Sequence, residues 1–407
     1  RLVKTMNVPL LAANAIRTDN GKAYFQEYVT LNRHGLNITI IGFTNPNIKG
    51  WLSPGLWEGM TFESLLPFAQ ETVDRIKAKE KSDVVIVAVH AGTGKGDGSV
   101  LESQGLDLFK SLRGVDFVVC AHDHSPVVHK NDSICLINAG SHCRSLGYGT
   151  VKVKVEGGKV VSKSLDAELM PMDKNNVDKD MQKVFHADYE AVKAFTLKEV
   201  GDLKADLSTR DAYIGMADYM NLIHTLSLGC APAQISFAAP LTFDGFIKAG
   251  TLVYNDLFTI YPYENQLFVV NMTGNEIKDY LEYSYDLWIN TIDSADDHLL
   301  KIKDSPDPRT GRKHWSFVNR SYNFDSAGGL IYEVDVTRPK GERVNIKSLA
   351  DGTPFDLSSS YNVAMTSYRA SGGGGIMRDG AGVDTDKIHE RVVEYYPEIR
   401  EILYDYL

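Results

Sequence analysis

The chain has 407 residues, 43% of them apolar, which is enough for two or three domains with substantial buried cores. Its formal net charge of -10 argues against general binding to the backbone of a nucleic-acid polymer. The charge still permits a small phosphorylated substrate, because bound metal ions would reverse the local sign.

The first part of the chain predicts strands that alternate with helices. A strand is expected over residues 36–42, and two short, fully buried strands are expected at 84–89 and 115–119. Between the first two strands lies a stripe of apolar residues at helical spacing, formed by Phe62, Leu66, Ala69, Val73 and Ile76. Strand, helix and strand in this order predict a parallel βαβ layer. An alternating run at 151–155, followed by a Gly-Gly turn, predicts a hairpin at the edge of that layer.

The character of the sequence changes after the predicted hairpin. Charged residues and apolar residues at helical spacing predict one long amphipathic helix over 176–200. We interpret this helix as a connector between a first domain at 1–175 and a second domain at 201–407.

The second domain is expected to mix helices with strands. Thr273 and Glu276 form a capping box ahead of an apolar helical stripe, and residues 332–336 alternate as a strand does. No internal repeat and no low-complexity tract interrupts this pattern.

The cysteines and the apolar runs exclude some classes of protein. The four cysteines include no C-x-x-C pair, which indicates neither a zinc knuckle nor a disulfide framework. A bond between Cys135 and Cys143 stays open. No apolar run has the length needed to cross a membrane, and no signal peptide is visible.

Three histidines follow two of the buried-strand patterns. His90 ends the run at 84–89, and His122 and His124 follow the run at 115–119. Ligands of an open α/β sheet bind beyond the strand ends, so three imidazoles delivered there indicate a metal site. Histidines on surface loops are common, and each one alone favours that simpler interpretation. All three together favour metal ligands.

A second informative stretch, Ser367–Gly375, ends in four consecutive glycines. Such a backbone can approach a ligand closely, and its N–H groups can bind anions. Tyr368 adds a flat face and Arg369 a positive fork, while Tyr263 lies in a separate aromatic cluster. Two tyrosines from separate loops can sandwich a planar base, with stacking worth about 1–3 kcal/mol per base. A flexible loop and ordinary tyrosine packing are the alternatives, but the Tyr-Arg pair beside the glycines favours a nucleotide site.

These residues resemble the two-domain nucleotidase family of the calcineurin-like metallophosphoesterases. In that family, an N-terminal α/β metal domain is joined by a helix to a C-terminal substrate domain. The segment Val87–Gly92 is similar to the family's late single-histidine motif. The segment Ala121–His124 is similar to its G-H-x-H motif, with Ala121 in place of the glycine.

Segments of the second domain narrow the resemblance. Thr366–Gly373 is closer to the Tyr-Arg-Ala form of the 2',3'-cyclic-nucleotide 2'-phosphodiesterase/3'-nucleotidase branch than to the Phe-Leu-Ala form of the 5'-nucleotidase branch. Asp256–Asn265 is similar to the family segment that supplies one stacking aromatic, and Asn323–Asp325 supports the same branch. The resemblance implies an α/β fold: a partial metallophosphoesterase α/β layer, a connecting helix and an α+β substrate-binding C-terminal domain.

One departure from the family is large. Its opening motifs, D-x-H, a G-D segment and G-N-H-[DE], do not precede His90 in this chain. Arg1–Ala15 resembles the segment just after the third motif, and the chain begins without Met. We therefore expect a family member that lacks its N-terminal strands and helices, and that hydrolyses phosphate esters feebly or not at all.

The resemblance implies metal-dependent hydrolysis of nucleotide phosphate esters, with no side-chain nucleophile. His90 and His122 would bind one divalent metal and His124 the other. The metals would be zinc, manganese or similar ions, two in an intact enzyme and one or none in this chain. The residues implied in binding the nucleotide are Tyr263, Tyr368, Arg369, Gly372 and Gly373.

Two other functions stay open beside this hypothesis. One is a 5'-nucleotidase or nucleotide pyrophosphohydrolase of the same family, and the other is a non-catalytic nucleotide-binding fragment. Each of these functions has a small-molecule nucleotide or nucleoside as its partner and no nucleic-acid polymer. The resemblance also implies a periplasmic or exported protein.

Overall fold

The computed structural model describes residues 7–52, 54–172, 177–305 and 313–407. Contacts between residues divide the chain into two compact units. The N-terminal unit consists of residues 1–49 and 53–179, and the C-terminal unit of residues 50–52 and 180–407. The finer division, with a connecting helix over 176–200, stays a prediction.

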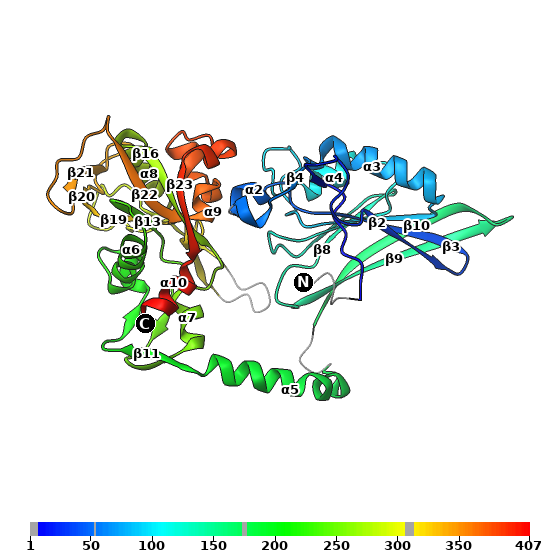
Figure 1. Cartoon of the computed structure of the whole chain (residues 1–407), viewed down its shortest axis with the longest axis horizontal. Helices are drawn as coiled ribbons and strands as arrows, with labels where there is room; N and C mark the ends of the chain where they lie inside the picture. Colours follow the sequence, from blue (N-terminus) through cyan, green and yellow to red (C-terminus); the bar gives the residue numbers. More distant parts are fainter. Residues whose placement is uncertain (1–6, 53, 173–176, 306–312) are drawn as a thin grey trace. The chain divides into compact units, whose positions relative to one another are not determined.

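The N-terminal unit is built on a six-stranded sheet with the order β2-β3-β5-β6-β8-β7 (Figure 1). β3, β5, β6 and β8 run parallel, while β2 and β7 at the two edges are antiparallel to their neighbours. The strands are β2 Tyr28–Arg33, β3 Leu36–Phe43, β5 Val84–Val89, β6 Phe117–Cys120, β7 Val127–Lys130 and β8 Cys135–Asn138. The predicted parallel layer is therefore confirmed.

One of the predicted strands is displaced along the chain. β6 begins at Phe117 rather than at Val115. The reason is Asp116, which is buried and accepts a hydrogen bond from the backbone N–H of Val85 at 2.8 Å through its side chain. Lys163 donates a hydrogen bond to the same carboxylate at 2.7 Å, and its positive charge compensates the buried negative charge of Asp116.

Two helices, α3 and α4, pack against one face of this sheet. They are α3 Leu65–Glu80 and α4 Gly105–Ser111. The buried stripe of α3 contains Ala69, Val73 and Ile76, as predicted, but it starts at Leu65. Phe62 lies instead in β4. Leu66, also predicted for the stripe, has an extended backbone and is not fully buried, so the regular helical backbone begins after it. The remaining short elements are β1 Ala15–Arg17, α2 Ile48–Trp51 and β4 Met60–Phe62.

The predicted hairpin is confirmed, but its predicted position at the sheet edge is wrong. β9 Ser145–Glu156 and β10 Lys159–Pro171 form a separate two-stranded sheet. Ala167 of β10 packs with Phe117, Cys135 and Ile137, which lie on the face of the six-stranded sheet opposite α3 and α4. Alternation gives each hairpin strand an apolar side, and the sheet face buries part of it.

The C-terminal unit contains a five-stranded sheet with the order β19-β13-β22-β16-β23 (Figure 1). Its central strand pair is antiparallel, β22 with β16. The strands are β13 Ile235–Ala238, β16 Gln266–Thr273, β19 Ser326–Gly328, β22 Ser360–Thr366 and β23 Val392–Glu398. This sheet confirms a mixed α+β second domain.

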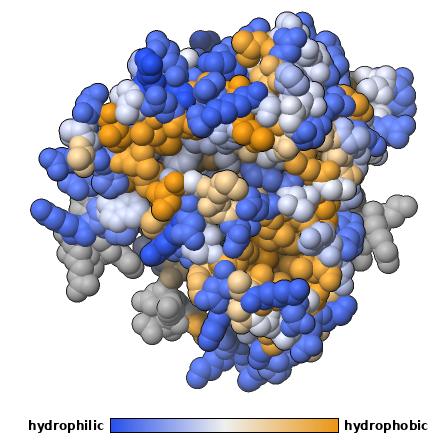
Figure 2. Space-filling model, turned by 90° about the vertical axis from the view of Figure 1, so that its left-hand side faces the viewer, coloured by the Kyte–Doolittle hydropathy of each residue, from blue (hydrophilic) through white to orange (hydrophobic). Residues whose placement is uncertain are grey.

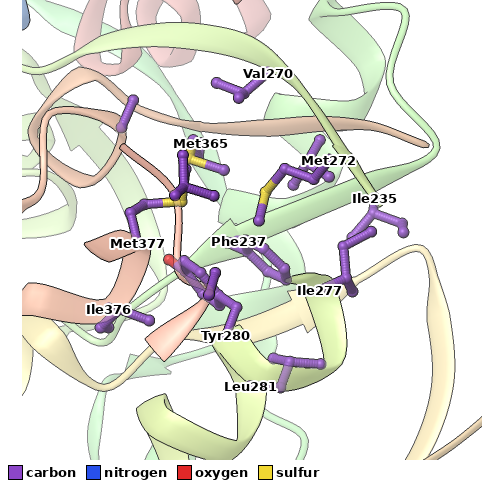
Figure 3. Close-up of a cluster of buried hydrophobic side chains, with 14 of the residues drawn as sticks. Ile235, Phe237, Val270, Met272, Ile277, Tyr280, Leu281, Met365, Ile376 and Met377 are labelled. Atoms are coloured by element: carbon purple, nitrogen blue, oxygen red, sulfur yellow. The ribbon is translucent and has the colours of Figure 1, made fainter. Parts of the chain in front are cut away.

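Period-two alternation gives the sheet two apolar faces. Val270 and Met272 of β16 lie in one buried cluster with Tyr280 of α8, where Phe237 stacks on the Tyr280 ring at a centroid distance of 4.0 Å (Figure 3). Val269 lies in a second cluster, together with residues of α6, α7 and α10. The helices are α6 Asp218–Cys230, α7 Tyr254–Ile260, α8 Gly274–Trp288 and α10 Ile399–Tyr406.

The predicted capping box begins α8. The Thr273 hydroxyl accepts from the Glu276 backbone N–H at 3.3 Å, and the Glu276 carboxylate accepts from the Thr273 N–H at 2.9 Å. The predicted strand at 332–336 is present as β20 Leu330–Val334, paired with β21 Val344–Leu349.

The remaining elements of the C-terminal unit are short, except for α5 Lys179–Thr196. α5 confirms a long amphipathic helix, and residues 173–176 before it lie outside the described part of the chain. The short elements are β11 Glu199–Leu203, β12 Leu207–Ser208, β14 Phe246–Ile247, β15 Gly250–Val253, β17 Ile302–Asp304, β18 Trp315–Phe317 and α9 Ser367–Ala370.

Cysteine chemistry and helix length agree with the sequence. All four cysteines are free, with Cys135 buried in β8 and Cys143 exposed, so the open pairing of these two is not made. Among the described residues, no helix is both long and apolar enough to cross a membrane.

Candidate functional site

The predicted metal histidines lie beyond the ends of two neighbouring parallel strands. β5 ends at Val89 and β6 at Cys120, so His90 and the turn at 121–124 meet at one edge of the sheet. The rings of His90 and His122 are 5.2 Å apart between centroids, at an angle of 71°. His122 and His124 have φ angles of 74° and 55°, so they lie on an irregular turn and not on a regular strand.

Asp123, between the two histidines, fixes this turn. Its carboxylate accepts a hydrogen bond from the Thr93 backbone N–H at 2.7 Å and another from the Asn138 side chain at 2.7 Å. Thr93 follows β5, and Asn138 is the last residue of β8. The Asp123 carboxylate therefore links the segments at the ends of β5, β6 and β8. It lies between His122 and His124, which both have a left-handed backbone.

The electrostatic surroundings of His90 favour its neutral imidazole. The pKa of His90 is lowered by burial first, and then by the neighbouring His122 and His124. A neutral imidazole is the form that binds metal ions. The carboxylate of Glu102 lies 3.8 Å from His122 Nε2 and adds a negative charge at the same edge.

The donor set does not amount to a preformed metal centre. Across the described ranges, no group of three or more His, Cys, Asp or Glu side chains is arranged to hold a metal ion. His90 and His122 are brought together, whereas the His124 ring lies 6.3 Å from the ring of His142, which was not predicted as a site residue. The role of His90, His122 and His124 as metal ligands stays a prediction.

The predicted clamp tyrosines are brought to one end of the five-stranded sheet. Leu267 at the start of β16 pairs with Thr366 at the end of β22, so the segments at 261–265 and 367–370 lie side by side. Tyr368 belongs to α9, directly after β22. Tyr263 follows the helix α7, so the two tyrosines come from separate segments, as expected.

A third tyrosine, Tyr322, contacts both clamp tyrosines. Its ring is 5.9 Å from the Tyr263 ring at 77°, and 6.2 Å from the Tyr368 ring at 82°. Tyr263 remains 39% exposed. The expected face-to-face meeting of Tyr263 and Tyr368 is untested, and the cluster contains an edge-to-face neighbour that the sequence analysis missed.

Arg369 is fully buried and acts as the centre of a hydrogen-bond network. Its guanidinium holds Asp325 with two bonds of 2.8 and 2.7 Å and donates to the Tyr322 carbonyl at 2.8 Å. Its remaining group bonds the Asn323 side chain at 3.2 Å and the Gly373 carbonyl. These five bonds use the five donors of a guanidinium, so Arg369 positions the loops around the tyrosines.

The charges in this network compensate each other. Burial, the largest single cause, lowers the pKa of Arg369, but the Asp325 carboxylate together with Tyr280 and Tyr368 raises it above its ordinary value. Asp325 also accepts a hydrogen bond from the hydroxyl of the buried Tyr280. Direct contact between Arg369 and a nucleotide stays a prediction.

Two positions in the glycine loop need glycine for different reasons. Gly372 has a φ of 97°, which side chains rarely adopt. A Cβ atom on Gly373 would lie 2.4 Å from the Tyr368 ring, so this ring packs directly on the glycine backbone. The loop therefore supports the Tyr368 ring, and an additional role of Gly372 and Gly373 in binding a nucleotide stays a prediction.

Comparisons with known proteins assign the C-terminal unit to a domain family. Residues 196–379 match the family model described as the C-terminal domain of 5'-nucleotidases, so the C-terminal unit is a member of that domain family. The chain as a whole has the fold of the two-domain 5'-nucleotidases. The family model over residues 196–379 agrees with the resemblance seen in the sequence.

Curated relatives align with most of the chain. The trifunctional nucleotide phosphoesterase protein YfkN of Bacillus subtilis is 26% identical over 100% of this chain and 30% of its own length. The 2',3'-cyclic-nucleotide 2'-phosphodiesterase/3'-nucleotidase of Yersinia enterocolitica is 23% identical over 90% of this chain and 64% of its own length. The chain thus spans less than two thirds of these relatives.

Solved structures show the same fold. A Staphylococcus aureus structure described as a 5'-nucleotidase in complex with alpha-ketoglutarate has a TM-score of 0.75 and 21% identity, covering 100% of this chain and 76% of its own. The 5'-nucleotidase precursor of Thermus thermophilus has a TM-score of 0.57 and 22% identity, with the same coverage.

Proposed function

We propose that the C-terminal unit binds the base of a nucleotide at Tyr263 and Tyr368, and that the chain serves metal-dependent hydrolysis of nucleotide phosphate esters. The observation that carries this proposal is the aromatic cluster fixed to a glycine loop by a buried ion pair. Stacking on a rigid ring costs little ordering on binding and tolerates any base. The base would therefore contribute affinity, and the ester would determine the reaction.

The ester we propose is a 2',3'-cyclic nucleotide or a 3'-nucleotide. The segment Tyr368-Arg369-Ala370 supports this choice, as do relatives that carry this activity in their names. The reaction transfers a phosphoryl group to water, so the P–O ester bond breaks and the leaving oxygen takes a proton. In hydrolysis of this class, divalent metal ions supply Lewis-acid stabilisation of the phosphoryl oxygens.

A 5'-nucleotidase activity is the second candidate. The 5'-nucleotidase of Vibrio parahaemolyticus is 25% identical over 68% of this chain and 56% of its own length. A periplasmic or exported location belongs to the proposal for both activities.

Product analysis tests the proposal and separates the candidates. Purified protein is incubated with manganese or zinc and with 2',3'-cyclic AMP, 3'-AMP or 5'-AMP in turn. In line with the feeble hydrolysis expected from the sequence, we expect at most slow release of 3'-AMP from the first substrate and of adenosine from the second. Preferential release of phosphate from 5'-AMP would favour the second candidate, and nucleoside binding without turnover would favour the non-catalytic alternative.

Metal content gives a separate measurement of the histidine role. We expect His122→Ala to lower bound metal, measured by elemental analysis, together with any turnover. The exposed His34, which has a left-handed φ of 52° but lies in the turn between β2 and β3 rather than after β5 or β6, provides the control His34→Ala. Unchanged metal content in His122→Ala would contradict the assignment.

A further inference from the structure

The C-terminal unit contains a cavity of about 720 Å³ that the proposed nucleotide site does not use. It lies between α6, the end of α8 and the segment from β19 to β20. On the face that carries α6 and β20, Figure 2 shows apolar side chains gathered in recessed patches between hydrophilic ones. Volumes of about 300–1,000 Å³ are typical of small-molecule sites.

This cavity is separate from the tyrosine cluster. Tyr263, Tyr322 and Tyr368 are not among its lining residues, and neither is Arg369. Its walls are mainly apolar and include Met220, Leu299 and Leu330. A ligand in this cavity would therefore not need the base clamp.

No lining side chain carries a formal charge near neutral pH. The lining set contains no Asp, Glu, Lys or Arg, and its one histidine is His224. Burial lowers the pKa of His224 to about 4, and its two ring nitrogens are 2.8 Å from the Ser236 hydroxyl and 3.3 Å from that of Ser326. A phosphate or carboxylate in the cavity would have no charged partner, so burying one would be costly.

One donor in the cavity wall has no acceptor. Trp288 is buried between the stacked rings of Tyr285, at a centroid distance of 5.3 Å, and Phe324, at 5.5 Å. Its indole Nε1–H is buried and makes no hydrogen bond. Because this N–H is enclosed by protein atoms, an acceptor in the cavity does not reach it, and Trp288 contributes wall rather than a hydrogen bond.

The mouth of the cavity is apolar as well. Ile214 and Met216 line it, and they are 73% and 91% exposed. Large apolar side chains at this exposure are the expected rim of a site that takes up an apolar molecule from water.

From these observations we propose a second ligand site, which binds an uncharged, mainly apolar small molecule through its shape and apolar contacts. The apolar body fills the space beside Met220 and Leu330. This site is independent of the proposed nucleotide chemistry, and its occupant is not a nucleotide.

Binding of prodan, an uncharged naphthalene ketone whose fluorescence reports its surroundings, tests the proposal on the whole chain. We expect saturable binding with blue-shifted emission. Thr225→Trp introduces a bulky ring at an exposed lining position of α6, and it should abolish binding. The control is Gly229→Trp, on the same helix but outside the lining, where a Cβ meets nothing within 4 Å. It should bind prodan as the unchanged protein does.

Two further measurements define the ligand class. Phenylnaphthylamine should bind more tightly than anilinonaphthalene sulfonate, which has the same framework with an added negative charge. Excess adenosine should leave prodan bound. The proposal is overturned by absent prodan binding, by full binding to Thr225→Trp, by preference for the sulfonate, or by displacement with adenosine.

Discussion

The histidine turn and the tyrosine cluster hold their side chains in different ways. The turn depends on one carboxylate, Asp123, which bonds a backbone N–H and an amide, and the histidine rings stay partly or largely accessible. The tyrosine cluster rests on a buried ion pair, in which Arg369 and Asp325 are each 3% exposed. The tyrosine cluster is therefore built before a ligand arrives, whereas the histidine rings are held less completely in place.

The difference predicts a large effect at the ion pair. Arg369→Ala leaves the Asp325 charge buried and unpaired, which we expect to cost about 3–5 kcal/mol of unfolding free energy. Urea unfolding, followed by hydrogen exchange of peptides from α8 and β22, measures it. The control Arg378→Ala breaks the exposed pair with Asp386, which is worth about 0–1 kcal/mol. Equal losses in the two variants would contradict the account.

Acid should act on the C-terminal unit through His224. Its pKa is lowered to about 4 by burial, so the unfolded chain binds this proton more readily than the folded one. The free energy of unfolding is therefore highest above the unfolded pKa of about 6.5. It decreases by about 1.4 kcal/mol per pH unit as the pH falls towards the folded pKa. Unfolding at pH 7 and pH 5 measures the slope. His224→Gln should reduce it, and an unchanged slope would contradict this assignment.

At the histidine turn we expect a smaller and more local effect. Asp123→Ala removes the acceptor for the Thr93 N–H and for Asn138, which should cost about 1–3 kcal/mol. Faster hydrogen exchange at Thr93 and in the segment after β6 measures it. Asp97, an exposed acceptor for the Ser99 hydroxyl, gives the control Asp97→Ala. An equal change of hydrogen exchange in Asp97→Ala and Asp123→Ala would contradict the role of Asp123 in fixing the turn.

Regular elements were predictable because their patterns are local. The alternation of β16, the capping box at Thr273 and the buried runs at 84–89 each define an element within a few residues. Failures occurred where tertiary contacts decided the outcome. Asp116 displaced the start of β6, and the face of the large sheet received the hairpin that had been assigned to its edge.

The candidate site was predictable in its residue types but not in their neighbours. The turn at His122 and His124 and the position of Tyr368 beside glycine follow from short motifs. Tyr322 is not marked by any local pattern, because its contact with Tyr263 and Tyr368 arises from a loop distant in sequence. The use of all five Arg369 donors could not be predicted either, because four of the five hydrogen bonds go to residues 322–325, which are distant in sequence.

Calorimetric titration of adenosine into the Tyr368 variants tests the central claim most directly. Tyr368→Phe keeps the ring on Gly373 and should retain most of the affinity. Tyr368→Ala removes one stacking face and should weaken binding by about 1–3 kcal/mol, while metal bound at the histidines stays unchanged. Equal adenosine affinity in the alanine variant and the unchanged protein would contradict a base clamp at Tyr263 and Tyr368.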